Sequence, residues 1–398
     1  MSIRSLGFLI FLSIFFLGTQ FPGHAQGALE IQDEEAEVSF GDEIVFSARL
    51  HLPDQEGRTT LFIRPREGFR TTSAEVTPGI SGRVQHSYEL EGVLLPPFSS
   101  VEYWYQWEGV DGGTLVSPTF SFDYFDNRFT WRTLESPPIR LHWVEGDVQF
   151  AQEALDIARE SLLSIQEDLP AETDATGPES WIDIYVYPSA EDLRTALTQG
   201  GESWLAGHAD PQLGVILASI PPGLEQTTEM ERQIPHELGH VLLYRRTGAE
   251  YSNLPTWLNE GIASHYEAYA NPNYPILLEN AYADGLLFPA DSLCRAFPAS
   301  ASDTLLAYAQ SASFVNYLFS EHGTSGINRL IDEYADGKSC DRGAEVALSK
   351  PLASLERDWR QAVFGEDAWR NLVPWVGLAA IVFLPMLLSV FFHRRPSG

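Results

Sequence analysis

The chain has 398 residues, 44% of them hydrophobic and 20% charged, which is enough for two or three domains with cores of their own. It contains 25 lysine and arginine residues against 55 aspartate and glutamate residues, so its formal charge at pH 7 is −30. This balance argues against nucleic acid as a partner, because phosphate contacts depend on basic side chains.

The first apolar segment predicts a secretory signal peptide over residues 1–25. Arg4 precedes the apolar run 6–17, and small residues, among them Ala25, follow at the expected cleavage point. The run itself is too short to span a bilayer comfortably. We therefore expect the mature chain to be exported.

Residues 28–125 show the pattern of a β-sandwich domain. Apolar residues recur at every second position, as in Ile44, Phe46 and Ala48, and turn residues separate the runs. This spacing is typical of a sandwich of roughly 100 residues. The aromatic residues near 104–107 could form a ligand platform, although such a stripe more often belongs to the core. Residues 126–139 resemble a polar linker in composition.

Residues 140–365 combine strands with helices. The hydrophobic spacing predicts a helix over 146–169, strands over 181–187 and 213–220, and mostly helices from residue 225 onward. This order indicates an α+β domain with a mostly helical C-terminal half. Cys294 and Cys340 lie in this part, and the sequence leaves open whether they form a disulfide or two free thiols.

The C-terminal apolar run predicts a transmembrane helix over residues 372–392. The run contains no charged residue and is long enough to cross the hydrocarbon core of a bilayer. Arg394 and Arg395 follow it, and basic flanks stay on the cytoplasmic side, so 393–398 would be a cytoplasmic tail. We therefore expect a single-pass protein of the cell membrane with its N-terminal ectodomain outside the cytoplasm.

The sequence His236-Glu237-Leu238-Gly239-His240 lies in a helical stretch. Two histidines four residues apart project from one face of a helix and can bind one metal ion. Glu237 lies on the flank of that face, where it can reach a metal-bound water without being a ligand. Pro235 removes a helix hydrogen bond, and we expect a kink just before the histidines.

A second motif, Trp257-Leu258-Asn259-Glu260-Gly261-Ile262-Ala263, follows after a turn. Glu260 would be an ordinary surface glutamate if it were considered alone. Its apolar neighbours indicate that the stretch is buried, where a carboxylate needs a cation. Glu260 could therefore be the third ligand of a His₂Glu set, which leaves zinc one open position.

The paired motifs resemble those of the gluzincin metallopeptidases, and most of all the peptidase-MA-like domain related to the thermolysin and aminopeptidase N families. The resemblance covers roughly residues 140–365. It implies one zinc ion held by His236, His240 and Glu260, with Glu237 as general base. It also implies a small sheet whose edge strand binds the substrate backbone by strand addition, and residues 213–220 are the candidate for that edge.

Tyr308 resembles the tyrosine of the aminopeptidase Y-x-K-G motif, which donates a hydrogen bond to the oxyanion. Gln310 and Ser311 replace the lysine and glycine of that motif, so Tyr308 is either catalytic or a packing residue. A G-x-M-E-N segment, which would bind a substrate amino terminus, is absent from the sequence. This absence favours cleavage inside a chain.

The predicted fold class is multidomain: an N-terminal all-β sandwich, then an α+β zincin-like metallopeptidase domain with a mostly helical C-terminal half, then one transmembrane helix. The predicted function is a membrane-anchored extracytoplasmic zinc endopeptidase acting on peptides or proteins. The alternative is a catalytically silent zinc-binding or adhesive module of the cell surface. The sequence does not indicate an oligomeric state.

Overall fold

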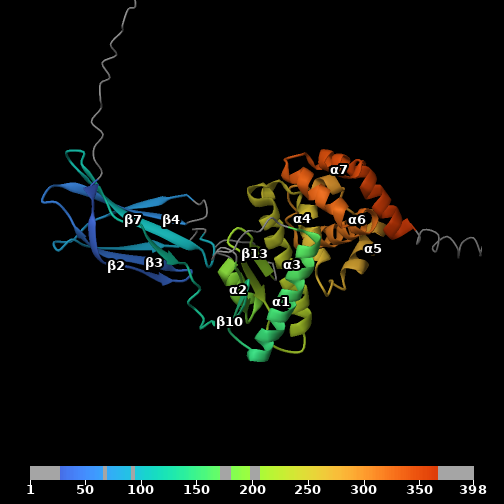
Figure 1. Ribbon diagram of the computed structural model, residues 1–398, viewed down its shortest axis with the longest axis horizontal. Helices are drawn as coiled ribbons and strands as arrows, with labels where there is room; N and C mark the ends of the chain where they lie inside the picture. Colours follow the sequence, from blue (N-terminus) through green and yellow to red (C-terminus); the bar gives the residue numbers. More distant parts are fainter. Residues whose placement is uncertain (1–26, 66–69, 91–94, 171–180, 198–206, 366–398) are drawn as a thin grey trace, which may run out of the picture. The chain divides into compact units, whose positions relative to one another are not determined.

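The computed structural model describes residues 27–65, 70–90, 95–170, 181–197 and 207–365, and these divide into two compact units (Figure 1). Among the described residues, one unit consists of 27–37, 44–65, 70–88 and 100–123. The other consists of 38–43, 89–90, 95–99 and the described residues from 124 to 365.

The N-terminal unit is rich in β-strands. One sheet has the order β1-β8-β7-β4-β5, with β9 also pairing with β7, and a second sheet has the order β2-β3-β6. The strands are β1 (Gly27–Ala28), β2 (Glu30–Ser39), β3 (Glu43–His51), β4 (Gly57–Pro65), β5 (Thr72–Val76), β6 (Arg83–Glu89), β7 (Ser100–Gly109), β8 (Thr114–Val116) and β9 (Phe120–Asp123).

The aromatic residues of β7 alternate between the core and the outer face of the sheet. Tyr103, Tyr105 and Trp107 are buried, whereas Trp104 is partly exposed and stacks on Phe62 of the neighbouring strand at a ring-centroid distance of 5.2 Å. The core interpretation of the stripe at 104–107 is therefore confirmed for Tyr105 and Trp107, but not for Trp104.

The second unit contains a five-stranded sheet of order β10-β11-β12-β14-β13. Its central strands β11, β12 and β14 are parallel, and the outer strands β10 and β13 are antiparallel to their neighbours. Strand β10 lies within residues 126–139, where the sequence predicts a linker. The strands are β10 (Arg132–Ser136), β11 (Ile139–Trp143), β12 (Ile182–Tyr187), β13 (Gly207–Asp210) and β14 (Val215–Ser219).

The expectation that residues 213–220 form the edge of this sheet is wrong. They contain β14, which is paired with β12 on one side and with β13 on the other. All five residues of β14 are buried, and such a continuous apolar run is typical of an inner strand. The edge is β13, four residues whose composition carries no clear strand signal.

Helices follow the strands and cover the sheet. Helix α1 begins after Asp147, whose side chain accepts a hydrogen bond from the backbone of Phe150 at 2.9 Å, and it packs against β11 and α3 (Figure 1). Helix α3 continues through Pro235. The helices are α1 (Val148–Asp168), α2 (Ala190–Leu197), α3 (Gln226–Thr247), α4 (Thr256–His265), α5 (Tyr274–Asp284), α6 (Ala301–Ala335) and α7 (Cys340–Leu348), with 3-10 helices η2 (Gly248–Asn253) and η3 (Ala290–Leu293).

Cys294 and Cys340 form a disulfide, which decides between the two alternatives left open by the sequence. Cys294 directly follows η3, and Cys340 is the first residue of α7. The backbone carbonyl of Cys294 also accepts a hydrogen bond from Thr256 at the start of α4, at 3.1 Å. The bridge therefore ties α7 to the chain next to α4.

The prediction of a transmembrane helix is not supported by the described residues. The predicted signal peptide (1–25) and transmembrane segment (372–392) lie outside the described residues, and none of the helices within the described ranges is both long and apolar enough to span a bilayer. The longest, α6, is interrupted at Gly323 and carries charged residues, among them Asp303 and Arg329. The described residues therefore do not support the transmembrane helix of the predicted fold class or a single-pass location in the membrane.

Candidate metal centre

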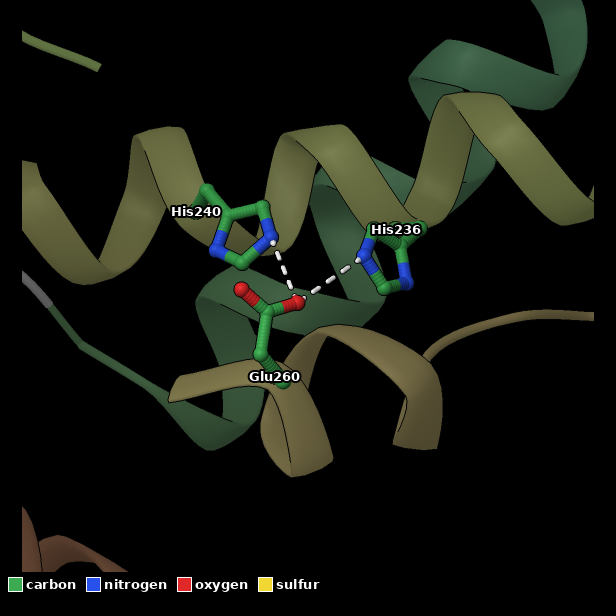
Figure 2. Close-up of side chains that lie close together, drawn as sticks. All are labelled: His236, His240 and Glu260. Atoms are coloured by element: carbon green, nitrogen blue, oxygen red, sulfur yellow. Dashed lines mark ion pairs between the residues drawn. The ribbon is translucent and has the colours of Figure 1, made fainter. Parts of the chain in front are cut away.

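Helix α3 presents His236 and His240 on one face, as their four-residue spacing predicts (Figure 2). Their ring centroids are 5.0 Å apart and the ring planes make an angle of 77°. Both side chains are largely buried, with 16% and 11% of their surface exposed. The two Nε2 atoms are the ones that face the neighbouring helix α4.

Glu260 comes from α4 and points between the two imidazoles (Figure 2). Its Oε2 atom lies 3.5 Å from Nε2 of His236 and 3.5 Å from Nε2 of His240. Ligands at 2.0–2.1 Å from a tetrahedral zinc ion are roughly 3.4 Å apart, so these separations fit such an ion without a large movement. Helix α4 holds the carboxylate at this depth because Trp257, Leu258 and Ile262 are buried in the core.

The electrostatics of these three residues also fit a cation. Burial by itself would lower the pKa of His236, but its hydrogen bonds to Glu260 and Glu267 outweigh this effect and raise the pKa well above its usual value. Burial would raise the pKa of Glu260, and the two histidines, His240 most strongly, lower it instead. A buried carboxylate between two imidazoles therefore requires positive charge, which protons or a metal ion can supply.

Outer hydrogen bonds fix the orientation of both imidazoles. Nδ1 of His236 donates to Oε1 of Glu267 at 3.0 Å, and Nδ1 of His240 donates to Oδ1 of Asn259 at 3.1 Å. The amide of Asn259 in turn donates to the hydroxyl of Tyr251 at 2.8 Å. With Nδ1 occupied as a donor, Nε2 of each histidine is left as the atom that can coordinate a metal.

Sequence reasoning missed these three supporting residues. Asn259 directly precedes Glu260, and this adjacency was the one local signal for its role. Glu267 lies beyond the end of α4 at His265, so helical periodicity could not place it. Tyr251 belongs to the 3-10 helix η2, which has no counterpart in the expected elements.

The candidate catalytic residues and the candidate ligands line one small cavity of about 220 Å³. Glu237 and Tyr308 are among its lining residues, and the edge strand β13 lines it through Gly207, His208 and Ala209. The ring of Tyr308 also packs edge-on against Phe297, at a centroid distance of 5.1 Å. Tyr308 therefore lines the same cavity as the candidate ligands and also has a packing contact. The cavity is lined by Gly207, His208, Ala209, Pro211, His236, Glu237, His240, Tyr251, Asn259, Glu260 and Tyr308.

Solved structures with detectable similarity align only weakly. A purple acid phosphatase from yellow lupin (Lupinus luteus) seeds is 9% identical over 49% of this chain and 35% of its own, with a TM-score of 0.21. A polysaccharide deacetylase from Bacillus cereus is 8% identical over 52% of this chain and 66% of its own, with a TM-score of 0.22. A β-glucuronidase from Bifidobacterium dentium is 11% identical over 55% of this chain and 41% of its own, with a TM-score of 0.17. This chain thus covers less than two thirds of each of them, and the scores are too low to carry an argument about fold or function.

A search of curated proteins finds no match to this sequence. The family model of the Peptidase MA superfamily, in contrast, matches residues 158–365, which is more than half of the 398-residue chain. The matched region contains the helices α3 and α4 with their histidines and glutamate. This chain therefore belongs to the Peptidase MA superfamily.

Proposed function

We propose that this protein is a zinc metallopeptidase in which His236, His240 and Glu260 hold the metal. Family membership supports metallopeptidase chemistry in general terms. The observation that carries the specific proposal is the position of the Glu260 carboxylate, 3.5 Å from both Nε2 atoms, in the same cavity as Glu237. Two nitrogen ligands and one oxygen ligand are typical of a catalytic zinc site with an open position.

Zinc bound there would polarise the scissile carbonyl and lower the pKa of a bound water toward 7. Glu237 is next to the ligand His236 in sequence and is only 6% exposed, so its carboxylate has little bulk water around it. In the proposed mechanism Glu237 accepts a proton from the attacking water and passes it to the departing amine. The hydroxyl of Tyr308 would donate a hydrogen bond to the developing oxyanion.

Strand β13 is the proposed binding edge for the substrate backbone, in place of residues 213–220. Among the described strands it pairs with β14 alone, and it lines the cavity through residues 207–209. A peptide could add to the side of β13 that does not pair with β14, by main-chain hydrogen bonds. Because the sequence lacks the aminopeptidase clamp for a free amine, we propose cleavage of internal bonds. An N-acetylated peptide should then be cut as fast as its free counterpart, and a strong preference for the free amine would refute this part.

The test of the proposed function compares the wild-type full chain with Glu237→Gln. Both proteins should bind one zinc ion, because Glu237 is not a ligand in this proposal. Turnover of a broad peptide library should fall by about two to four powers of ten in the variant, which is the usual contribution of acid–base catalysis. Equal cleavage by both proteins would refute the mechanism. Zinc binding without any cleavage by the wild type would favour the catalytically silent zinc-binding module instead.

A further inference from the structure

Strand β13 lies against helix α3, and its first residue, Gly207, has no side chain. Gly207 is buried and pairs with Ala218 of β14. An ideal Cβ atom placed on Gly207 would lie 2.6 Å from Oε1, 3.2 Å from Cδ and 3.3 Å from Cγ of Glu237. The three heavy atoms nearest to that position therefore all belong to the candidate general base.

The backbone of Gly207 does not itself require glycine. Its φ angle lies outside the left-handed region, unlike that of Gly82 at 73°. Glycine inside a strand lowers stability relative to residues with a side chain, because it loses more conformational entropy and packs no side-chain atoms. Alanine would thus suit the strand better, and the neighbour that excludes it is the Glu237 side chain.

We propose that Gly207 is a positioning residue for Glu237, a role that rests on the proposed function. The missing side chain lets the Glu237 carboxylate lie directly against the backbone of the edge strand. The Cβ atom of an alanine at position 207 would lie 2.6 Å from Oε1 of Glu237, whereas an ordinary contact needs at least 3.4 Å. The carboxylate would therefore move by roughly 0.8 Å. The carboxylate moves rather than the strand, because it is the far end of a flexible side chain.

The displacement affects the proton acceptor and leaves the three candidate metal ligands untouched. An error of about 1 Å in the placement of a catalytic group can cost on the order of a hundredfold in rate. Gly207→Ala should therefore lower kcat by about 10- to 100-fold while the protein still binds one zinc ion. Gly79→Ala is the matched control, since a Cβ there would meet only the carbonyl oxygen of Arg83, at 3.5 Å.

A double-mutant cycle in kcat separates the proposed contact from a general disturbance of the strand. Glu237→Asp shortens the side chain by one methylene and withdraws it from residue 207. In that background Gly207→Ala should change kcat by less than about threefold, because the clash no longer exists. An equal loss in the wild-type and Glu237→Asp backgrounds would overturn the proposal, and so would a wild-type kcat in Gly207→Ala.

The contact can also be tested without activity. In thermal unfolding of the full chain, Gly207→Ala should raise Tm in a Glu237→Ala background more than in the wild type, because the opposing carboxylate is gone. If the Tm shifts of Gly207→Ala and Glu237→Ala simply add in the double variant, the contact is refuted, even if the protein is an active peptidase. If the shifts do not add and the protein cuts no peptide, the contact is upheld and the proposed function is refuted. The two failures are therefore distinguishable.

Discussion

Replacement of Glu267 by glutamine and by alanine should weaken zinc binding in two steps. The Glu267 side chain is only 6% exposed, and its Oε1 atom accepts the Nδ1 proton of His236 at 3.0 Å. Glutamine keeps an acceptor oxygen within reach and removes the charge alone, whereas alanine removes both. Loss of such an outer carboxylate costs 10- to 100-fold in metal affinity. We expect about tenfold, or about 1.4 kcal/mol, for Glu267→Gln and about a hundredfold for Glu267→Ala.

The assay is a titration of the metal-free protein with zinc against a chelator of known affinity, with Tm recorded for each variant. Glu279→Gln serves as the control, because Glu279 is exposed on α5 and lies outside the cavity that contains the candidate ligands. Unchanged zinc affinity in Glu267→Ala, in a protein that folds normally, would refute the assignment of His236 as a ligand oriented by Glu267. Equal losses for Gln and Ala would show that the charge alone matters.

Two further predictions concern Tyr308 and the disulfide. Tyr308→Phe should lower kcat by about a hundredfold if the hydroxyl stabilises the oxyanion, whereas an unchanged kcat would leave the ring as a packing partner of Phe297. Replacement of both Cys294 and Cys340 by serine should lower the free energy of unfolding by up to about 4 kcal/mol, since the bridge closes a loop with a sequence separation of 46 residues. Denaturant unfolding measures that loss, and a change below about 1 kcal/mol would contradict the loop-entropy account.

Local sequence patterns predicted several elements of the second unit and the pairing of the two histidines. The helix expected over 146–169 is α1 at Val148–Asp168, and the strand expected over 181–187 is β12 at Ile182–Tyr187. The approach of His236 to His240 follows from the period of the helix, because residues four apart lie on one face. These features depend on short-range spacing, which is the information that a single sequence carries best.

Features that depend on long-range packing could not be predicted. Strand β13 has four residues, and its position at the sheet edge is decided by its pairing with β14. Glu267 reaches His236 across 31 positions of sequence, after the chain has left the periodic part of α4. The contact between Gly207 and Glu237 likewise joins a strand to a helix. In each case tertiary structure supplies a neighbour that no local pattern specifies.

The position of Glu260 relative to the two histidines of α3 depends on how α4 packs against its neighbours. A substitution at Gly261 tests this dependence. A Cβ atom on Gly261 would lie 2.3 Å from Cγ2 of Val315 and 2.7 Å from the backbone oxygen of Ser311, both on α6. Backbone cannot rotate away as the Glu237 carboxylate can, so α4 itself must shift and carry Glu260 with it. Overpacking of this kind costs about 1–3 kcal/mol.

Gly261→Ala should therefore lower both Tm and zinc affinity, whereas Gly207→Ala should lower kcat and leave zinc affinity unchanged. Thermal unfolding with and without zinc, together with the chelator titration, measures both quantities for the two variants. A Gly261→Ala protein with wild-type zinc affinity would mean that Glu260 does not depend on the α4–α6 contact for its position. The contrast follows from what each missing Cβ would meet: the Val315 side chain and the Ser311 backbone oxygen of α6 at Gly261, and the end of a flexible side chain at Gly207.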